Sequence, residues 1–176
     1  MYRLTFLLLL FIVPVAVGQS PRTTSVNVYF SNDKLIPGGE DCTGKVFPVT
    51  RKVPKTAGVA RAAIEQLIGG PTESEKAKGY TSFFTDETKS VLLGLKVKNK
   101  TAYVNFKDLT AITNLGNATT SCGNTHFFAQ LDKTVLQFPG IKRVFYAIEG
   151  DPEAFYGWLQ LDCPKALKNC AKTNFK

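Results

Sequence analysis

The sequence predicts an α+β fold built as a single domain, in which one mixed sheet carries two main helices and a disulfide-stapled C-terminal extension follows. The main observation is the order of hydrophobic patterns along the chain, which is strand, strand, helix, hairpin, helix, strand. The length of 176 residues is close to the size of one ordinary domain. Hydrophobic residues are 44% of the chain and charged residues 20%, which is typical of globular proteins and not of disordered ones.

The N-terminus has the layout of a secretory signal peptide. Arg3 precedes an apolar run over residues 4–17, and Ala16 and Gly18 put small residues at the positions that a signal peptidase reads. The run is shorter than the roughly 20 residues that span a bilayer, which disfavours a retained anchor. We therefore expect residues 1–18 to be removed by cleavage after Gly18. The product would be secreted or periplasmic and would have no stable membrane anchor.

All four cysteines lie beyond this segment, at Cys42, Cys122, Cys163 and Cys170. Export would place them where disulfides persist, and an even number permits complete pairing. We favour Cys163–Cys170 as a short C-terminal loop, which leaves Cys42–Cys122 to tie an early loop to the start of a helix. Pairing of Cys163 with Cys122 or Cys42 is equally compatible with the sequence.

Two strands are predicted before the first helix. Residues 25–30 alternate apolar and polar side chains, the pattern of a half-buried strand. Residues 46–53 indicate a second strand. Pro48 within it lacks the N–H that a ladder needs, so this strand is expected to be bent or to lie at a sheet edge.

An amphipathic helix is predicted to begin near Lys55. Its apolar stripe has helical spacing and consists of Ala60, Ala63, Ile64, Leu67 and Ile68. Residues 69–71, Gly-Gly-Pro, end it, because Gly accepts a left-handed cap and Pro cannot continue a helix. Thr72 and Glu75 have the spacing of a capping box that starts a short second helix, which Gly79 is expected to end.

Residues 91–106 predict a β-hairpin with one buried face. Apolar side chains alternate with polar ones on both sides of a turn at residues 99–100. The apolar positions are Val91, Leu93, Leu95, Val97, Ala102, Val104 and Phe106.

The second half of the domain is predicted to continue with a helix, a strand and a short helix. Residues 121–138 have helical spacing of apolar side chains, and Pro139-Gly140 follows. Residues 144–148 are apolar on both faces, which indicates a central strand. Asp151 as N-cap and Pro152 at the first helical position predict the last helix.

A series of short motifs in this order resembles the GerMN domain, a module named after spore-germination and sporulation proteins of bacteria. In chain order the motifs are Val28-Tyr29-Phe30-Ser31, residues 47–53, residues 69–75 followed by Gly79, residues 102–106 and residues 136–141. The Gly-Pro-Thr segment after the amphipathic helix is the most specific of them. The resemblance covers roughly residues 26–150, which leaves residues 151–176 as a C-terminal extension.

The resemblance implies an exported, non-enzymatic binding or assembly module of the bacterial cell envelope, similar to ring-building modules of secretion and sporulation machinery. The family has no established catalytic residues, so no catalytic residue and no cofactor are assigned. The expected partner is an unidentified protein or an anionic envelope polymer, and self-association into a homo-oligomer is a further expectation. The alternative is an envelope or extracellular hydrolase with an unrecognised site near Tyr156 and Trp158.

The candidate binding residues are Arg51, Lys96, Lys98, Lys100 and Tyr103. The Arg51 side chain could hold an acidic ligand by a bidentate contact, although a structural pair with a carboxylate is favoured. The three lysines, together with Tyr103, could form a basic platform on the hairpin for an anionic polymer. The plainer interpretation, a solvated strand face whose lysines block edge-to-edge pairing, carries more weight.

No metal site is expected. Cys122 and His126 are four residues apart on the predicted helix, the spacing of half a metal site, but His126 is the only histidine in the chain. A disulfide cysteine and a surface histidine are therefore favoured. The acids Glu149, Asp151 and Glu153 lack the pattern of a calcium loop, which favours strand-end and helix-cap roles.

Overall fold

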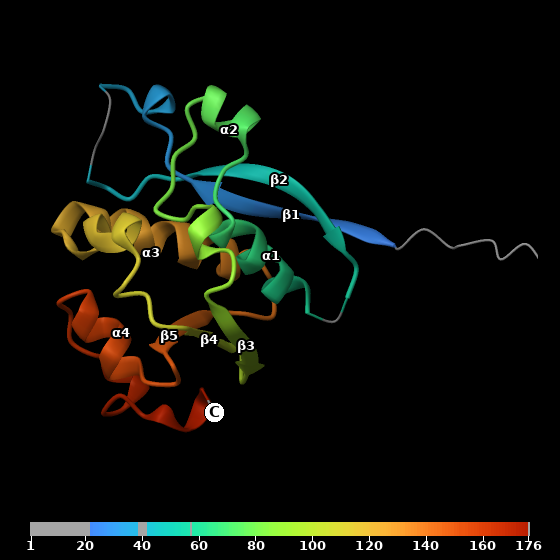
Figure 1. The fold of residues 1–176 in the computed structure, drawn as a ribbon. Helices are drawn as coiled ribbons and strands as arrows, with labels where there is room; N and C mark the ends of the chain where they lie inside the picture. The colour runs from blue at the N-terminus through green and yellow to red at the C-terminus, as the bar shows by residue number, and fades with distance from the viewer. Residues whose placement is uncertain (1–21, 39–41, 57, 176) are drawn as a thin grey trace, which may run out of the picture.

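Residues 22–38, 42–56 and 58–175 are described by the computed structural model. The predicted signal peptide, residues 1–18, lies outside the described residues. Within them, none of the helices combines the length and the apolar character that crossing a membrane requires. The described chain is an α+β domain, as predicted (Figure 1).

The strands form two sheets. β1 (Thr23–Phe30) and β2 (Phe47–Pro54) make an antiparallel pair. β3 (Leu92–Lys98), β4 (Thr101–Phe106) and β5 (Arg143–Ile148) make a second sheet in the order β3-β4-β5. β3 and β4 are the predicted hairpin, and β5 runs parallel to β4. The prediction of a single mixed sheet is therefore wrong in this detail, because only the second sheet is mixed.

The outer edge of β1 explains why the sheets stay separate. The long helix α3 (Ser121–Leu136) lies along this edge, and Thr134 Oγ1 accepts a hydrogen bond from the Tyr29 N–H at 3.2 Å. Gln137, just after the helix, accepts from the Asn27 N–H at 2.9 Å and donates to the Asn27 carbonyl at 2.7 Å. Side chains of a helix thus satisfy backbone groups that a further strand would otherwise pair.

The helices α1 (Val59–Ile68) and α3 lie between the two sheets (Figure 1). The predicted stripe of α1 is buried at Ala63, Ile64, Leu67 and Ile68. The short helix α4 (Pro152–Trp158) packs on β5. The 3₁₀ helices of the described chain are η1 (Asp33–Leu35), η2 (Asp86–Thr88), η3 (Thr113–Thr119), η4 (Lys165–Leu167) and η5 (Lys172–Asn174).

The predicted helix caps are present. Thr72 Oγ1 accepts from the Glu75 N–H, and the Glu75 carboxylate accepts from the Thr72 N–H, so a capping box starts α2 (Glu73–Ala77). Asp151 caps α4, whose first residue is Pro152. Gly79, beyond α2, has a φ of +93° that favours glycine.

Two expectations about the second sheet are wrong. Leu93 and Val97 are 44% and 50% exposed. A bulge between Leu92 and Gly94 shifts the register of β3 and leaves Leu93 without a partner in β4, whereas Val97 is paired regularly with Ala102. β5 is an edge strand and not a central one. It is buried because Tyr146 packs against Phe128 of α3 and Phe155 of α4, while Phe145, which points to the other face, packs against Tyr103.

The disulfides follow the favoured pairing. Cys42–Cys122 joins the loop before β2 to the first turn of α3. Cys163–Cys170 closes a short loop in the C-terminal extension.

Candidate functional sites

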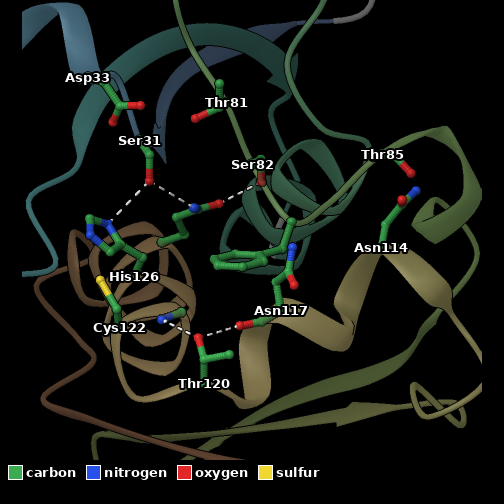
Figure 2. Close-up of a pocket in the computed structure, with 13 residues that line it drawn as sticks. Ser31, Asp33, Thr81, Ser82, Thr85, Asn114, Asn117, Thr120, Cys122 and His126 are labelled. Carbon is green, nitrogen blue, oxygen red and sulfur yellow. Dashed lines mark hydrogen bonds between the residues drawn. The ribbon is translucent and has the colours of Figure 1, made fainter. Parts of the chain in front are cut away.

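A polar cleft opens where the end of β1, residues 81–85, η3 and the first turns of α3 meet (Figure 2). Its volume is about 480 Å³. The lining residues are Ser31, Asp33, Thr81, Ser82, Phe83, Thr85, Asn114, Asn117, Thr120, Cys122, Gly123, His126 and Gln130. Hydroxyl and carboxamide side chains predominate among them, so the cleft offers neutral hydrogen-bonding groups.

Three features fix the walls of the cleft. Ser31 and Thr81 exchange backbone hydrogen bonds of 3.1 and 2.9 Å, which join the end of β1 to the wall formed by residues 81–85. The Cys42–Cys122 disulfide ties the loop before β2 to α3. A Cβ at Gly123 would overlap the Asn117 carbonyl oxygen, so the close approach of η3 to α3 depends on this glycine.

Gln130 organises the floor of the cleft. Its side chain is fully buried. It accepts a hydrogen bond from Ser82 Oγ at 2.5 Å and donates one to Ser31 Oγ at 3.3 Å, as Figure 2 shows. Ser31 Oγ also lies 3.4 Å from His126 Nδ1. The network spans three parts of the chain and holds two hydroxyls in place.

His126 is 7% exposed, so the prediction of a surface histidine is wrong. Helical spacing places it on the face of α3 that lines the cleft, beside Ser31. A serine nucleophile needs a base that takes its proton, and that base needs an orienting group. Ser31 Oγ lies at nearly the same distance from the Gln130 amide nitrogen, 3.3 Å, and from His126 Nδ1, 3.4 Å, and the Gln130 amide is no base.

Arg51 is held inside the chain. Its guanidinium makes a bidentate ion pair with Glu75, at 2.5 and 3.3 Å. It also donates to the carbonyls of Gln66, at 2.7 Å, and Gly70, at 2.9 Å, and it lies 5.3 Å from the centre of the Phe30 ring. This geometry is the structural pairing that the sequence favours, and a ligand-binding role for Arg51 stays a prediction.

The pKa of Glu75 reflects the same contacts. Burial alone would raise the pKa of its carboxyl group. The hydrogen bonds from Arg51 and from the Thr72 backbone, together with the attraction of the Arg51 charge, outweigh burial and lower the pKa below its usual range.

The hairpin lysines are part of a larger cationic end of the second sheet, which we define as Lys98, Lys100, Lys142 and Arg143. All four are exposed. The Lys142 N–H donates to the Lys100 carbonyl at 2.7 Å, and Arg143 pairs with Thr101 in the parallel ladder. None of the four forms an ion pair within the described part of the chain.

The sequence analysis missed Lys142 and Arg143. Two adjacent cations directly before an apolar strand were the available signal. Only the parallel pairing of β5 with β4 brings them beside Lys100.

Tyr103 lies under the C-terminal extension. Phe175 is 6% exposed, and its ring meets the Tyr103 ring edge-on with 5.4 Å between the ring centres. Phe145 lies against Tyr103 from β5, at 6.0 Å. Lys96 pairs with Tyr103 across the hairpin and is exposed. The extension thus packs against one side of the half-buried Tyr103 ring, which lines a small hollow together with Lys96, and the platform stays a prediction.

The region of Tyr156 and Trp158, where a hydrolase site was the alternative, is filled by aromatic rings. Tyr156 is 4% exposed, and the Trp158 ring packs against Phe127 and Phe155. A perturbed carboxylate lies nearby, since burial raises the pKa of Asp132. Its side chain accepts a hydrogen bond of 2.5 Å from the hydroxyl of Tyr146, which is buried. These contacts are those of a packed core.

The acids at the start of α4 have the structural role that was expected of them. Asp151 accepts from the Glu153 N–H at 3.0 Å and pairs with Lys172. Across the ranges that the structure describes, no three side chains of His, Cys, Asp or Glu gather in a way that could hold a metal ion.

The described chain is thus an α+β domain with a preformed polar cleft and a cationic end of the second sheet. A family model described as sporulation and spore germination, named Germane, matches residues 27–154. The chain belongs to this family. The comparison with curated proteins finds no match.

Two solved structures share the fold. One contains the tandem GerMN domains of the sporulation protein GerM from Bacillus subtilis, with a TM-score of 0.52 and 19% identity. The match covers 78% of this chain and 43% of that one, so the chain spans less than half of the tandem structure. The other is the first GerMN domain of the same protein, with a TM-score of 0.50, 19% identity, and coverage of 72% and 84%. The family and these structures support a GerMN-type domain.

Proposed function

We propose that this chain is an exported, non-catalytic GerMN-type module of the bacterial cell envelope and that it contacts an anionic envelope polymer through the cationic end. Membership of the family supports a non-catalytic role. Two disulfides are typical of proteins outside the cytoplasm.

The observation that carries the contact with a polyanion is the gathering of Lys98, Lys100, Lys142 and Arg143 at one end of the second sheet. These cations come from the hairpin and from the start of β5. They are exposed, and no carboxylate of the described chain neutralises them. Exposed like charges close together destabilise a fold slightly unless a ligand uses them, and they attract polyanions by releasing bound counterions.

The test compares two triple variants with equal changes in charge. Lys98→Glu, Lys100→Glu and Lys142→Glu reverse the cationic end. Lys52→Glu, Lys55→Glu and Lys78→Glu reverse three exposed lysines elsewhere. Binding of poly(glycerol phosphate), measured by isothermal titration calorimetry, should weaken by about 10-fold or more in the first variant only. Equal loss in both variants would mean that net charge alone drives binding, which would refute the site.

Self-association is a second candidate function. The outer strand β3 carries two exposed apolar side chains, Leu93 and Val97, and such a strand can pair with another chain. The lysines at positions 96 and 98 of the same strand oppose that pairing. Sedimentation velocity across a wide concentration range tests self-association. A persistent monomer argues against assembly, and a dimer that Val97→Lys abolishes supports it.

A further inference from the structure

We propose that the polar cleft is a binding site for a neutral sugar that carries hydroxyl and acetamido groups. This site is separate from the cationic end and does not depend on it. The cleft is shaped by the end of β1, residues 81–85, η3 and α3.

The chemistry of the lining disfavours an anionic ligand and offers many hydrogen-bonding groups to an uncharged one. No lysine or arginine belongs to the residues described as lining the cleft, and its carboxylate, Asp33, is exposed. Hydroxyls such as Thr85 and carboxamides such as Asn117 both donate and accept hydrogen bonds. Sugar hydroxyls and an acetamido group have the same dual character, so each can find a complementary partner here. A carboxylate such as Asp33 can accept from two neighbouring hydroxyls of a sugar ring.

Phe83 supplies the apolar part of the site. Its half-buried ring lines the cleft and packs edge-on against Phe127, with 5.7 Å between the ring centres. An aromatic ring with a fixed position gives the C–H face of a sugar a surface to pack against. Polar groups around one apolar surface are the usual composition of a small-molecule site.

The cleft is largely preformed. Gln130 fixes Ser31 and Ser82 through buried hydrogen bonds, and the Cys42–Cys122 disulfide fixes the start of α3. Groups that are already in place lose little conformational entropy on binding. The volume of about 480 Å³ lies within the range of sites for small ligands, so a unit of one or two sugar rings fits.

The probe is N,N′-diacetylchitobiose, added to the full exported chain with its disulfides intact and followed by NMR and calorimetry. We expect saturable binding, with amide shifts confined to residues 31–33, 81–85, 114–126 and 130. Cellobiose, which lacks the acetamido groups, should bind at least about 5-fold more weakly. Equal affinity for cellobiose would overturn the assignment of an acetamido ligand.

Two variants test the residues. Asn117→Ala removes an exposed carboxamide and keeps the carbonyl that accepts from Thr120, so the fold should persist while affinity falls about 5-fold. Phe83→Leu keeps much of the volume, loses the ring and should weaken binding similarly. Ser90→Ala, at an exposed position outside the cleft, is the matched control and should change nothing.

The charge-reversed variant of the cationic end separates this proposal from the proposed function. It should bind the sugar with unchanged affinity while its affinity for poly(glycerol phosphate) falls. Absence of saturable binding at millimolar sugar, shifts located outside the cleft, or retention of full affinity in both Asn117→Ala and Phe83→Leu would each refute the sugar site. None of these outcomes bears on the polymer contact.

Discussion

The polar cleft and the cationic end differ in how the chain holds them. In the cleft, Gln130 is fully buried and hydrogen-bonded to two serines, and a disulfide fixes one wall. At the cationic end, Lys98 and Lys100 are exposed and form no ion pair within the described chain. Side-chain contacts fix the polar groups of the cleft, whereas at the cationic end only the backbone ladder is fixed and the charged side chains extend from it.

This difference separates two kinds of recognition. Fixed neutral groups select the shape and the hydrogen-bonding pattern of a ligand. Mobile exposed charges select only the sign and density of charge, and salt weakens their effect. A module with both can be attracted to a charged envelope polymer and can select a neutral unit nearby.

The two disulfides give the largest test, because one ties a wall of the cleft and the other closes a loop of the C-terminal extension. Cys42–Cys122 closes a loop of 80 residues, and its loss should lower the free energy of unfolding by about 4.5 kcal/mol. Cys163–Cys170 closes a loop of 7 residues in the extension, and its loss should cost about 2.5 kcal/mol. Urea denaturation of the two Cys→Ser double variants measures both values.

Hydrogen exchange adds the location of each effect. The Cys42→Ser, Cys122→Ser variant should lose protection in the first turns of α3, whereas the Cys163→Ser, Cys170→Ser variant should lose it only in the extension. Equal losses of stability, or exchange that rises throughout the chain in both variants, would contradict the view that the cleft depends on its own disulfide.

The second prediction concerns the extension beside the cationic end. Phe175→Ala removes the buried ring that packs edge-on against Tyr103, and it should lower the free energy of unfolding by about 3 kcal/mol. Polymer binding should not fall, because the cations do not depend on this ring. Thr173→Ala, at an exposed position of the same segment, serves as control. Weaker polymer binding in the folded Phe175→Ala variant would show that the extension positions the cations.

Local elements could be predicted from the sequence because their determinants are close together in the chain. The capping box of α2 needs only Thr72 and Glu75, and the β3–β4 hairpin needs only a short turn and its alternating pattern. The edge position of β5 could not be predicted, since burial by α3 and α4 makes an edge strand as apolar as a central one.

The cleft could not be predicted for a related reason. Gln130 joins Ser82 and Ser31, which lie 48 and 99 residues away in sequence. Polar side chains that meet only after folding leave no periodic signal. Part of the cationic end could be predicted from the sequence, because Lys98 and Lys100 lie close together in the hairpin. Lys142 joins them only through the parallel ladder of β4 and β5.

The third prediction uses salt to separate the regions. Raising the salt concentration from about 50 to 200 mM should weaken binding of poly(glycerol phosphate) by about 10-fold, since neutralised phosphates release counterions. Binding of N,N′-diacetylchitobiose should change less than about 2-fold, because the sugar carries no charge and its binding releases no counterions. Calorimetric titrations at both concentrations measure the ratio. A similar loss for both ligands would mean that the cleft also works by charge.

The smallest expected effect is the dependence of stability on pH, because two carboxyl groups shift in opposite directions. Arg51 and the Thr72 backbone lower the pKa of Glu75, so its contribution to stability is present above the pKa of the unfolded chain and is lost as the pH falls through the folded value. Burial raises the pKa of Asp132. Its contribution is present in acid and is lost as the pH rises through the folded value.

Single substitutions separate these contributions and relate them to the two regions. Glu75 is in α2, which precedes the cleft wall at residues 81–85, whereas Asp132 is hydrogen-bonded to Tyr146 of β5, against which α4 packs. Glu75→Gln should lose stability relative to the unsubstituted chain at pH 7, and the difference should shrink toward pH 3. Asp132→Asn should gain stability at pH 7, because it removes a buried charge while its amide oxygen still accepts from Tyr146. The gain should shrink in acid, where Asp132 of the unsubstituted chain is itself protonated. Urea midpoints at intervals between pH 3 and 7 measure how each variant's stability difference from the unsubstituted chain changes with pH. If both differences changed in the same direction, the pKa values of Glu75 and Asp132 would not be shifted in opposite directions.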